Sequence, residues 1–489
     1  MQRSSDVGKL VLSGLLMGLA LLSGCGGNSS MSPQPPVSGE NTNVVVLLTS
    51  TSNDKVMQFD MAMTSVSLND SSGKSVSLFS KNFVQNGATG LTQFIPLNGA
   101  AQPLATVSVP QGTYTSATVN VAQCQFAVAD VVSGGLVGST FEQGLCGQGT
   151  GNTTVNLASP ITISGQGMAL ALNLQIPQSY TLTSTVTGPS LFTISPVFTL
   201  TPVSIAANPT DLNNGKITGL EAQIASVNPA GNSFTAQTAD GTMLNLSSSA
   251  TTQFQGVSGL AALTAGTLVN LDSAIQMDGT LQATRLEVAN PAAVVYDLML
   301  PLSPASPPGT TISQPLECFP APTFPLCISA FFISGSSVFR VSGQASNLAN
   351  LPFTPIFDGS NLILGQNVAV GSNTSTLGQG GEVAADITLV PQTLNGTVTA
   401  VATAGNFDVY TVALAPYHII PVMQQLAVVA PFATIANPTT VTVYADSSTQ
   451  QLQSGTIGPG SLLRFRGLLF NAGGALRLDC TEILDGVTE

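Results

Sequence analysis

The segment MALALNL at 168–174 places large apolar residues at every second position. A period of two is that of a β-strand, whose successive side chains point to opposite faces of a sheet. The run VVVLL at 44–48 is wholly apolar and is typical of a buried strand. MAMTSVSL at 61–68 is followed by the turn residues NDSSG and by a second short strand, which predicts a β-hairpin.

Further strands of this kind fill the region 43–206. ATVNV at 117–121 alternates, and FTISPVFTLTPV closes the region at 192–203. Proline cannot donate a backbone hydrogen bond, so Pro196 and Pro202 indicate an edge strand or a bulge. Seven or more short strands with turns between them predict a two-sheet β-sandwich over 43–206.

The remainder of the chain is repetitive, with three units over 214–291, 292–394 and 395–489. GTLVNL at 266–271 matches GSLLRF at 460–465, and the middle unit ends in the same way with GQNVAV. Each unit has about five or six strands, too few for a large sandwich. A small closed barrel hides its edge strands at that size. The sequence therefore predicts an all-β protein, with a sandwich followed by about three small barrels.

Two stretches resemble bacterial domains of uncharacterised function. VPQGTYTSATVNV at 109–121 and FTISPVF at 192–198 resemble a lipoprotein domain that covers most of 43–206. The repeated units resemble a module with an OB-like barrel, over 214–291, 395–487 and the second half of 292–394. The resemblance to the lipoprotein domain implies a fold and a location. The resemblance to the repeated module implies a barrel. Neither resemblance implies active or ligand-binding residues.

The N-terminus has the pattern of an export signal. Arg3 and Lys9 precede an apolar run from Leu10 to Leu22, and the sequence LSGC follows at 22–25. This resembles a bacterial lipobox, which implies a signal peptide over 1–25 and acylation of Cys25. The alternative is a membrane-spanning helix that ends in cysteine by chance, but the run is shorter than the ~20 residues that a span needs.

The residues after Cys25 suggest how the protein is held in the cell envelope. Gly26, rather than aspartate, favours the outer membrane by resemblance to lipoprotein sorting in two-membrane cells. Residues 26–42 are polar and rich in Gly and Pro, which predicts a flexible tether. The expected partner is thus the membrane, through the N-terminal lipid, and the side of the membrane that the chain faces stays open.

The charge balance excludes one class of partner. The chain has 11 Lys and Arg against 24 Asp and Glu, and charged residues make up only 7% of it. Proteins that bind nucleic acid neutralise phosphates with basic side chains, and no basic run occurs here. We therefore expect no nucleic-acid partner and no electrostatic docking on anionic lipid.

Five cysteines follow Cys25, and export permits disulfides. The pairings that close the shortest loops join Cys124 to Cys146 and Cys318 to Cys327. Cys480 is then left over, and on a strand we expect it to be a small buried residue. A zinc site is a poor alternative, because the cysteine spacings do not match one and the chain has a single histidine.

That histidine, His418, limits the catalytic options. It lies between prolines in the apolar stretch APYHIIP at 415–421, which predicts a structural role. No G-x-S-x-G motif occurs. Gly73–Ser75 lacks the earlier glycine of a phosphate-binding loop, so it is interpreted as a hairpin turn. The Asp-Gly pairs suit tight turns and lack the oxygen cluster of a calcium loop.

These observations favour a non-enzymatic binding or scaffold protein of the envelope, without metal or cofactor, whose partner is an envelope protein or a glycan. The absence of Trp weakens a carbohydrate-binding role without excluding it, since Phe and Tyr also stack on sugars. The alternatives are a hydrolase of carbohydrate or peptide that uses paired carboxylates, and an assembly factor that faces the periplasm. The proline-rich insertion at 301–327 is interpreted as a surface loop, with a partner-binding protrusion as the alternative.

Overall fold

The computed structural model is an all-β protein, as the sequence predicted, with a single short α-helix, α1 (Ile419–Gln424), among its described residues. The structure describes residues 40–81, 90–128, 151–183, 191–289, 293–298, 311–312, 315–319, 331–343, 348–372, 382–425 and 432–488. The predicted signal peptide, the predicted lipidation site Cys25, Cys146, Cys327 and most of the proline-rich insertion lie outside these residues.

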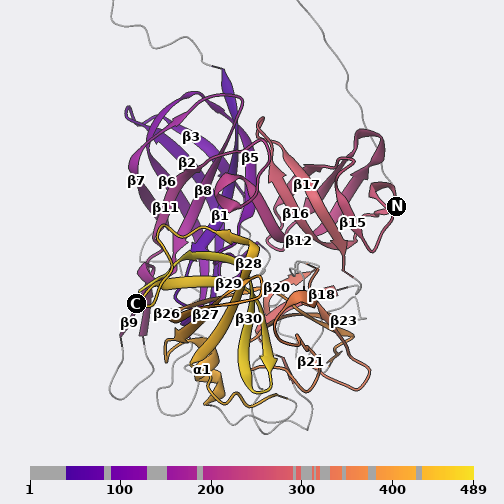
Figure 1. The fold of residues 1–489 in the computed structure, drawn as a ribbon. Helices are drawn as coiled ribbons and strands as arrows, with labels where there is room; N and C mark the ends of the chain where they lie inside the picture. The colour runs from indigo at the N-terminus through magenta and orange to yellow at the C-terminus, as the bar shows by residue number, and fades with distance from the viewer. Residues whose placement is uncertain are drawn as a thin grey trace, which may run out of the picture. The chain divides into compact units, whose positions relative to one another are not determined.

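The N-terminal region is a two-sheet sandwich (Figure 1). One sheet has the order β11-β8-β1-β5, from β1 (Asn41–Thr51), β5 (Gln102–Pro110), β8 (Gly167–Gln175) and β11 (Phe198–Val203). The other has the order β3-β2-β6-β7, from β2 (Val56–Asp70), β3 (Ser75–Ser80), β6 (Gly112–Val128) and β7 (Asn152–Ile163), and β4 (Thr92–Gln93) also pairs with β2. Side chains of both sheets, among them Val46, Leu172, Phe59 and Phe126, share one core.

The apolar run at 44–48 lies on β1 and is buried on both faces of its sheet. Val44, Val46 and Leu48 point into the sandwich core. Val45 and Leu47 point the other way and pack against the barrel that follows in the sequence. A strand covered on both sides loses the usual alternation of apolar and polar residues. This explains why the run is continuous.

The last unit is a closed five-stranded barrel with the order β26-β27-β28-β30-β29. Its strands are β26 (Gln392–Ala404), β27 (Phe407–Leu414), β28 (Thr440–Gln451), β29 (Leu462–Ala472) and β30 (Ala475–Asp485). The third strand, β28, runs parallel to the fifth, β30, whereas the other neighbours are antiparallel. The first unit repeats this order, as follows.

The strands of the first unit are β12 (Lys216–Asn228), β13 (Ser233–Gln237), β14 (Met243–Ser247), β16 (Leu268–Ile275) and β17 (Leu281–Val288). The parallel pairing of β14 with β17 closes the ring β12-β13-β14-β17-β16, and β15 (Gln253–Gln255) adds to its edge. The match strand by strand confirms the internal repeat that the sequence predicted.

The middle unit retains part of the same pattern. β18 (Ala293–Leu298) pairs with β23 (Asn367–Ser372), and β23 pairs with β25 (Asp386–Leu389). In the other two units, the first strand pairs with the fourth and the fourth with the fifth in the same way. Its described strands form two sheets, β20-β18-β23-β25-β22 and β19-β21-β24, which include β19 (Thr311–Ile312), β20 (Pro315–Phe319), β21 (Phe331–Phe332), β22 (Val338–Val341) and β24 (Glu382–Val383).

Two predicted boundaries need small corrections. β1 begins at Asn41 and Thr42 is fully buried, so the predicted tether at 26–42 extends two residues too far. β26 begins at Gln392, which pairs with Gly467, so the last unit starts before residue 395. The prolines behave as expected. Pro196 separates β10 (Leu191–Ile194) from β11, and Pro202 lies on β11 at the edge of its sheet.

Residues 40–489 form one compact unit, because the modules share cores and polar contacts. The hairpin tip at Asp240 and Gly241 is an example. Gly241 adopts a positive φ of 82°, as a tight turn requires. The Asp240 carboxylate accepts hydrogen bonds from Thr92 (2.6 Å) and Gln102 (3.1 Å) of the sandwich.

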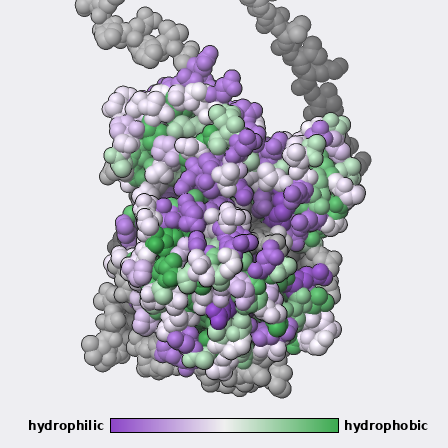
Figure 2. Space-filling model, viewed as in Figure 1, coloured by the Kyte–Doolittle hydropathy of each residue, from purple (hydrophilic) through white to green (hydrophobic). Residues whose placement is uncertain are grey.

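Figure 2 shows that hydrophobic residues on the visible face occur in separate small patches between polar ones. In the described part of the chain, no helix has the length and apolar character needed to cross a membrane.

Candidate functional site

The outer face of sandwich sheet β11-β8-β1-β5 becomes polar toward one end. On β1, Leu47 is followed at the same face by Thr49 and Thr51. Ala171 and Asn173 occupy the matching positions on β8, opposite Leu47 and Thr49 in the parallel register. The apolar end of the face is covered by the first barrel, which contacts Val45, Leu47 and Ala169. The polar end is left uncovered and forms the floor of a cavity.

We call this space the junction cavity. It has a volume of about 370 Å³, within the lower range of small-molecule pockets. Its walls come from the loop after β4, the linker between sandwich and first barrel, and strands β29 and β30 of the last barrel. The lining residues are Leu47, Thr49, Ser50, Thr51, Gly99, Ala100, Ala171, Asn173, Thr199, Thr201, Pro202, Val203, Ser204, Leu212, Asn213, Arg464 and Leu484.

Arg464, on β29, is the only charged side chain in this lining. It is 8% exposed. Its Nε donates to the backbone carbonyl of Asp485 (2.9 Å), and Nη1 donates to Oδ1 of Asn98 (2.5 Å). Burial lowers the pKa of Arg464 to about 10, against the opposing effect of Asp54 and Asp485. The guanidinium therefore keeps its positive charge at neutral pH.

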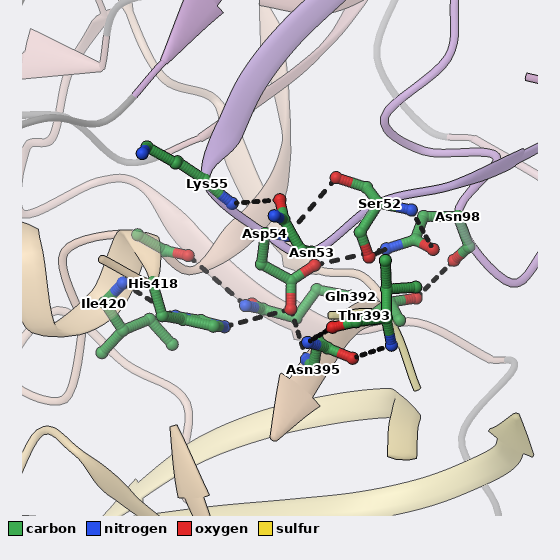
Figure 3. A network of polar contacts seen from close by, with 12 residues as sticks. Ser52, Asn53, Asp54, Lys55, Asn98, Gln392, Thr393, Asn395, His418 and Ile420 are labelled. Atoms are coloured by element: carbon green, nitrogen blue, oxygen red, sulfur yellow. Dashed lines mark hydrogen bonds and ion pairs between the residues drawn. The ribbon is translucent and has the colours of Figure 1, made fainter. Parts of the chain in front are cut away.

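Through Asn98, Arg464 is connected to a buried polar network that joins the sandwich to the last barrel. Figure 3 shows Asp54, Asn98 and Asn395 of this network. Asn98 is its centre. Its Oδ1 accepts from the Ser52 backbone (3.2 Å) as well as from Arg464, and its Nδ2 donates to Oδ1 of Asp54 (3.2 Å). The Asp54 carboxylate also accepts a hydrogen bond from the backbone N–H of Asn395.

Asp54 holds its position through an unusual backbone conformation. Its φ is +65°, in the left-handed region that Asp and Asn enter more readily than other non-glycine residues. It lies in the loop between β1 and β2, and its backbone carbonyl accepts from the N–H of Ile419 (3.3 Å). Both the main chain and the side chain of Asp54 thus contact the last unit.

His418 is fully buried beside Asp54, with Nε2 at 3.3 Å from Oδ2 of the carboxylate (Figure 3). Its Nδ1 accepts the backbone N–H of Ile420 (3.1 Å) at the start of α1. A nitrogen that accepts cannot carry a proton, so the proton is assigned to Nε2, facing Asp54. Nε2 has no hydrogen-bond partner among the described residues, and its contact with Asp54 is electrostatic. His418 is therefore enclosed by the fold and caps the start of α1 through its Nδ1.

Three buried acids have raised pKa values and lie on different strands. Burial raises the pKa of Asp60 to about 8, and it also raises the pKa of Asp386 and Glu482. These residues lie on β2, β25 and β30, and none lines the junction cavity. Burial is the largest cause of the raised pKa of each acid, and none of these three acids raises the pKa of another.

The cysteines of the mature chain fall in different settings. Cys124 on β6 is disulfide-bonded. Because Cys146 lies outside the described residues, the predicted pairing stays a prediction. Cys318 lies on β20, and its pairing with Cys327 also stays a prediction. Cys480 on β30 is free and buried, and burial raises the pKa of its thiol. Throughout the described ranges, no group of three or more His, Cys, Asp or Glu residues could hold a metal ion.

The junction cavity and Arg464 were not predicted from the sequence. The available signal was the placement of Thr and Asn at alternate positions of otherwise apolar strands, as at Thr49, Asn173 and Thr201. A second signal was the pair of arginines, Arg464 and Arg466, inside the apolar strand LLRFRGLLF at 462–470. Neither signal shows which strands meet.

No protein-family model matches the chain, and no curated protein sequence does. Among solved structures, a glycoside hydrolase family 32 structure from Bifidobacterium adolescentis aligns with 90% of this chain and 67% of its own, at 10% sequence identity and a TM-score of 0.11. A likeness of that strength carries no argument about fold or activity.

Proposed function

We propose that the chain is a lipid-anchored protein of the bacterial cell envelope that binds a small polar ligand without chemically converting it. The junction cavity carries the proposal. It is large enough for a small molecule, and hydroxyl and amide groups from three sandwich strands and the linker line it. The lining has no His, Cys, Asp or Glu, the side chains that most often transfer protons or activate a nucleophile.

The rigidity of the site supports a binding role. The cavity lies where the sandwich, the linker and the last barrel meet, and polar contacts fix all three. Arg464 and Asn98 join barrel to sandwich, and the Leu212 backbone donates to Gln450 of the barrel (3.3 Å). Side chains held in place before binding lose less entropy when a ligand arrives.

The ligand-binding role can be tested by filling the cavity. Ala171→Trp places a large side chain on the cavity floor, and Ala171→Ser is the matched control. We expect small molecules released by denaturation to accompany the wild-type protein and Ala171→Ser, when purified from their own envelope, and to be absent from Ala171→Trp. Mass spectrometry of the released fraction measures this. The same molecules from all three proteins, or none from any, would contradict a binding role.

The anchor is tested separately through Cys25. Lipoproteins are held by acyl chains on one cysteine, and several chains make a firm anchor. Cys25→Ala should move the protein from the membrane fraction to the soluble fraction and abolish incorporation of labelled palmitate. Cys480→Ala removes a buried thiol instead and should leave the protein in the membrane fraction. Membrane retention of Cys25→Ala would refute the anchor.

A further inference from the structure

We propose that the ligand of the junction cavity carries a carboxylate, which pairs with the Arg464 guanidinium, and hydroxyl groups, which bind the threonine-rich floor. The proposal rests on the proposed function and names the class of ligand that this site takes. Four observations carry it: the unpaired cation, its free donor, the absence of acids in the lining, and the pattern of hydroxyls.

Arg464 is a buried cation without an ion-pair partner. In the described part of the chain, no carboxylate oxygen lies within 4.0 Å of its nitrogens, and its two hydrogen bonds go to a neutral carbonyl and a neutral amide. Buried charges in proteins are normally paired or bound to an ion. By contrast, the buried Arg285 pairs with both Asp272 and Glu287 at 2.8 Å. Arg464 thus lacks the partner that the same chain provides elsewhere.

One nitrogen of Arg464 is free to bind a ligand. Nε and Nη1 are taken by protein acceptors, whereas Nη2 has no hydrogen-bond partner among the described residues. Nη2 is not fully enclosed by protein atoms, so a ligand can reach it. Arg464 lines the cavity, so a ligand bound there is the acceptor that we assign to Nη2. A guanidinium offers charged donors that suit a carboxylate.

The carboxylates near Arg464 do not accept a hydrogen bond from its Nη2. Asp54 and Asp485 both act on Arg464 electrostatically. Asp54 is already engaged by Asn98, Asn395 and His418. Oδ1 of Asp485 accepts from Ser454 (3.0 Å to N, 3.1 Å to Oγ). These two carboxylates lower the cost of burying the guanidinium, and they leave its Nη2 without an acceptor.

The rest of the lining suits a ligand rich in oxygen. Hydroxyls of Thr49, Thr199 and Thr201 and the amide of Asn213 can donate and accept, and no acidic or aromatic side chain is present. The absence of acids favours an anion over a cation, and the absence of rings favours hydrogen bonding over stacking. The volume of about 370 Å³ limits the ligand to the size of one or two sugar units. Hydroxylated carboxylates, such as sugar acids, match the expected charge, hydrogen-bonding groups and size.

The test compares acids with their neutral counterparts. The mature wild-type chain is titrated with D-glucuronate and D-gluconate, and in parallel with D-glucuronamide and D-glucose, by calorimetry and thermal shift. We expect at least one acid to bind at least about tenfold more tightly than its neutral counterpart, since a hydrogen bond to a charged group contributes ~1.5–3 kcal/mol. If neither acid binds, the proposal is overturned.

Variants then locate the contact. Arg464→Gln should weaken binding of the acid by at least about tenfold and leave the affinity for the neutral counterpart nearly unchanged. Arg477→Gln, which removes an arginine of the same barrel outside the cavity, should change neither affinity. If Arg464→Gln does not fold, the comparison of acid and neutral compound on the wild-type chain decides the matter.

The outcomes separate the two proposals. Equal affinity for acid and neutral compound, lost in Ala171→Trp, would overturn the carboxylate proposal and leave the binding role intact. Binding that survives in Ala171→Trp would show that the junction cavity is not the site, and both proposals would fail.

Discussion

Replacing Asp54 with alanine is expected to lower the free energy of unfolding by about 3–5 kcal/mol, the usual cost of removing one partner from a buried charged network. The substitution removes the acceptor of the Asn395 N–H, one acceptor of the Asn98 amide, and the carboxylate that faces His418. It also forces alanine into the left-handed conformation that Asp54 adopts at a φ of +65°. Urea unfolding followed by circular dichroism measures the loss.

Two further variants separate these causes. Asp54→Gly removes the side chain but accepts a positive φ without strain, so it should recover only the conformational part of the loss, about 1 kcal/mol. Asp54→Asn keeps one acceptor oxygen and should be less damaging than alanine. A loss below about 1 kcal/mol for Asp54→Ala would mean that the network does not hold the modules together.

Replacing Asp60 with asparagine should make stability less dependent on pH between about 4 and 8. Asp60 is 7% exposed, and burial raises its pKa to about 8, while a hydrogen bond from Gln58 (2.6 Å) partly opposes this. The folded chain thus keeps the carboxyl protonated over a range in which the unfolded chain ionises it. Unfolding then releases a proton, so wild-type stability falls as pH rises, by up to about 1.4 kcal/mol per pH unit.

Asparagine resembles the neutral carboxyl group and cannot ionise. The stability of Asp60→Asn relative to wild type should therefore increase steadily from pH 4 to pH 8, as measured by urea midpoints at each pH. Asp70→Asn is the matched control at the other end of β2. Hydrogen bonds from Ser72 and Lys74 lower the pKa of Asp70, so its contribution is lost only as pH falls below about 4. A constant difference between Asp60→Asn and wild type would show that Asp60 is ionised in the folded chain.

Much of the fold could be predicted because its signals are local. Alternation on β8, the hairpin that joins β2 to β3, and the repeated strand patterns of the first and last units depend on neighbouring residues alone. The parallel pairing that closes each of those two barrels follows from the repeat once one barrel is known. The single histidine lies in the apolar stretch 415–421, and its side chain is fully buried.

The site could not be predicted because it depends on contacts between distant residues. Asn395 lies 341 residues from Asp54, and Arg464 lies 366 residues from Asn98. The run at 44–48 was recognised as buried, but no local pattern says that its odd positions face a barrel and not the sandwich core. Likewise, Thr49 and Thr201 appear as ordinary solvent-facing strand residues until the linker and the last barrel enclose them.

The most direct test of the proposed ligand site is a crystal structure of the mature protein purified from its own envelope. We expect an open junction cavity, with Nη2 of Arg464 facing it and bound to an acidic group of a small molecule. A cavity filled by the protein's own side chains, or an Arg464 guanidinium paired with a carboxylate of the chain, would contradict the claim that this junction is a ligand site.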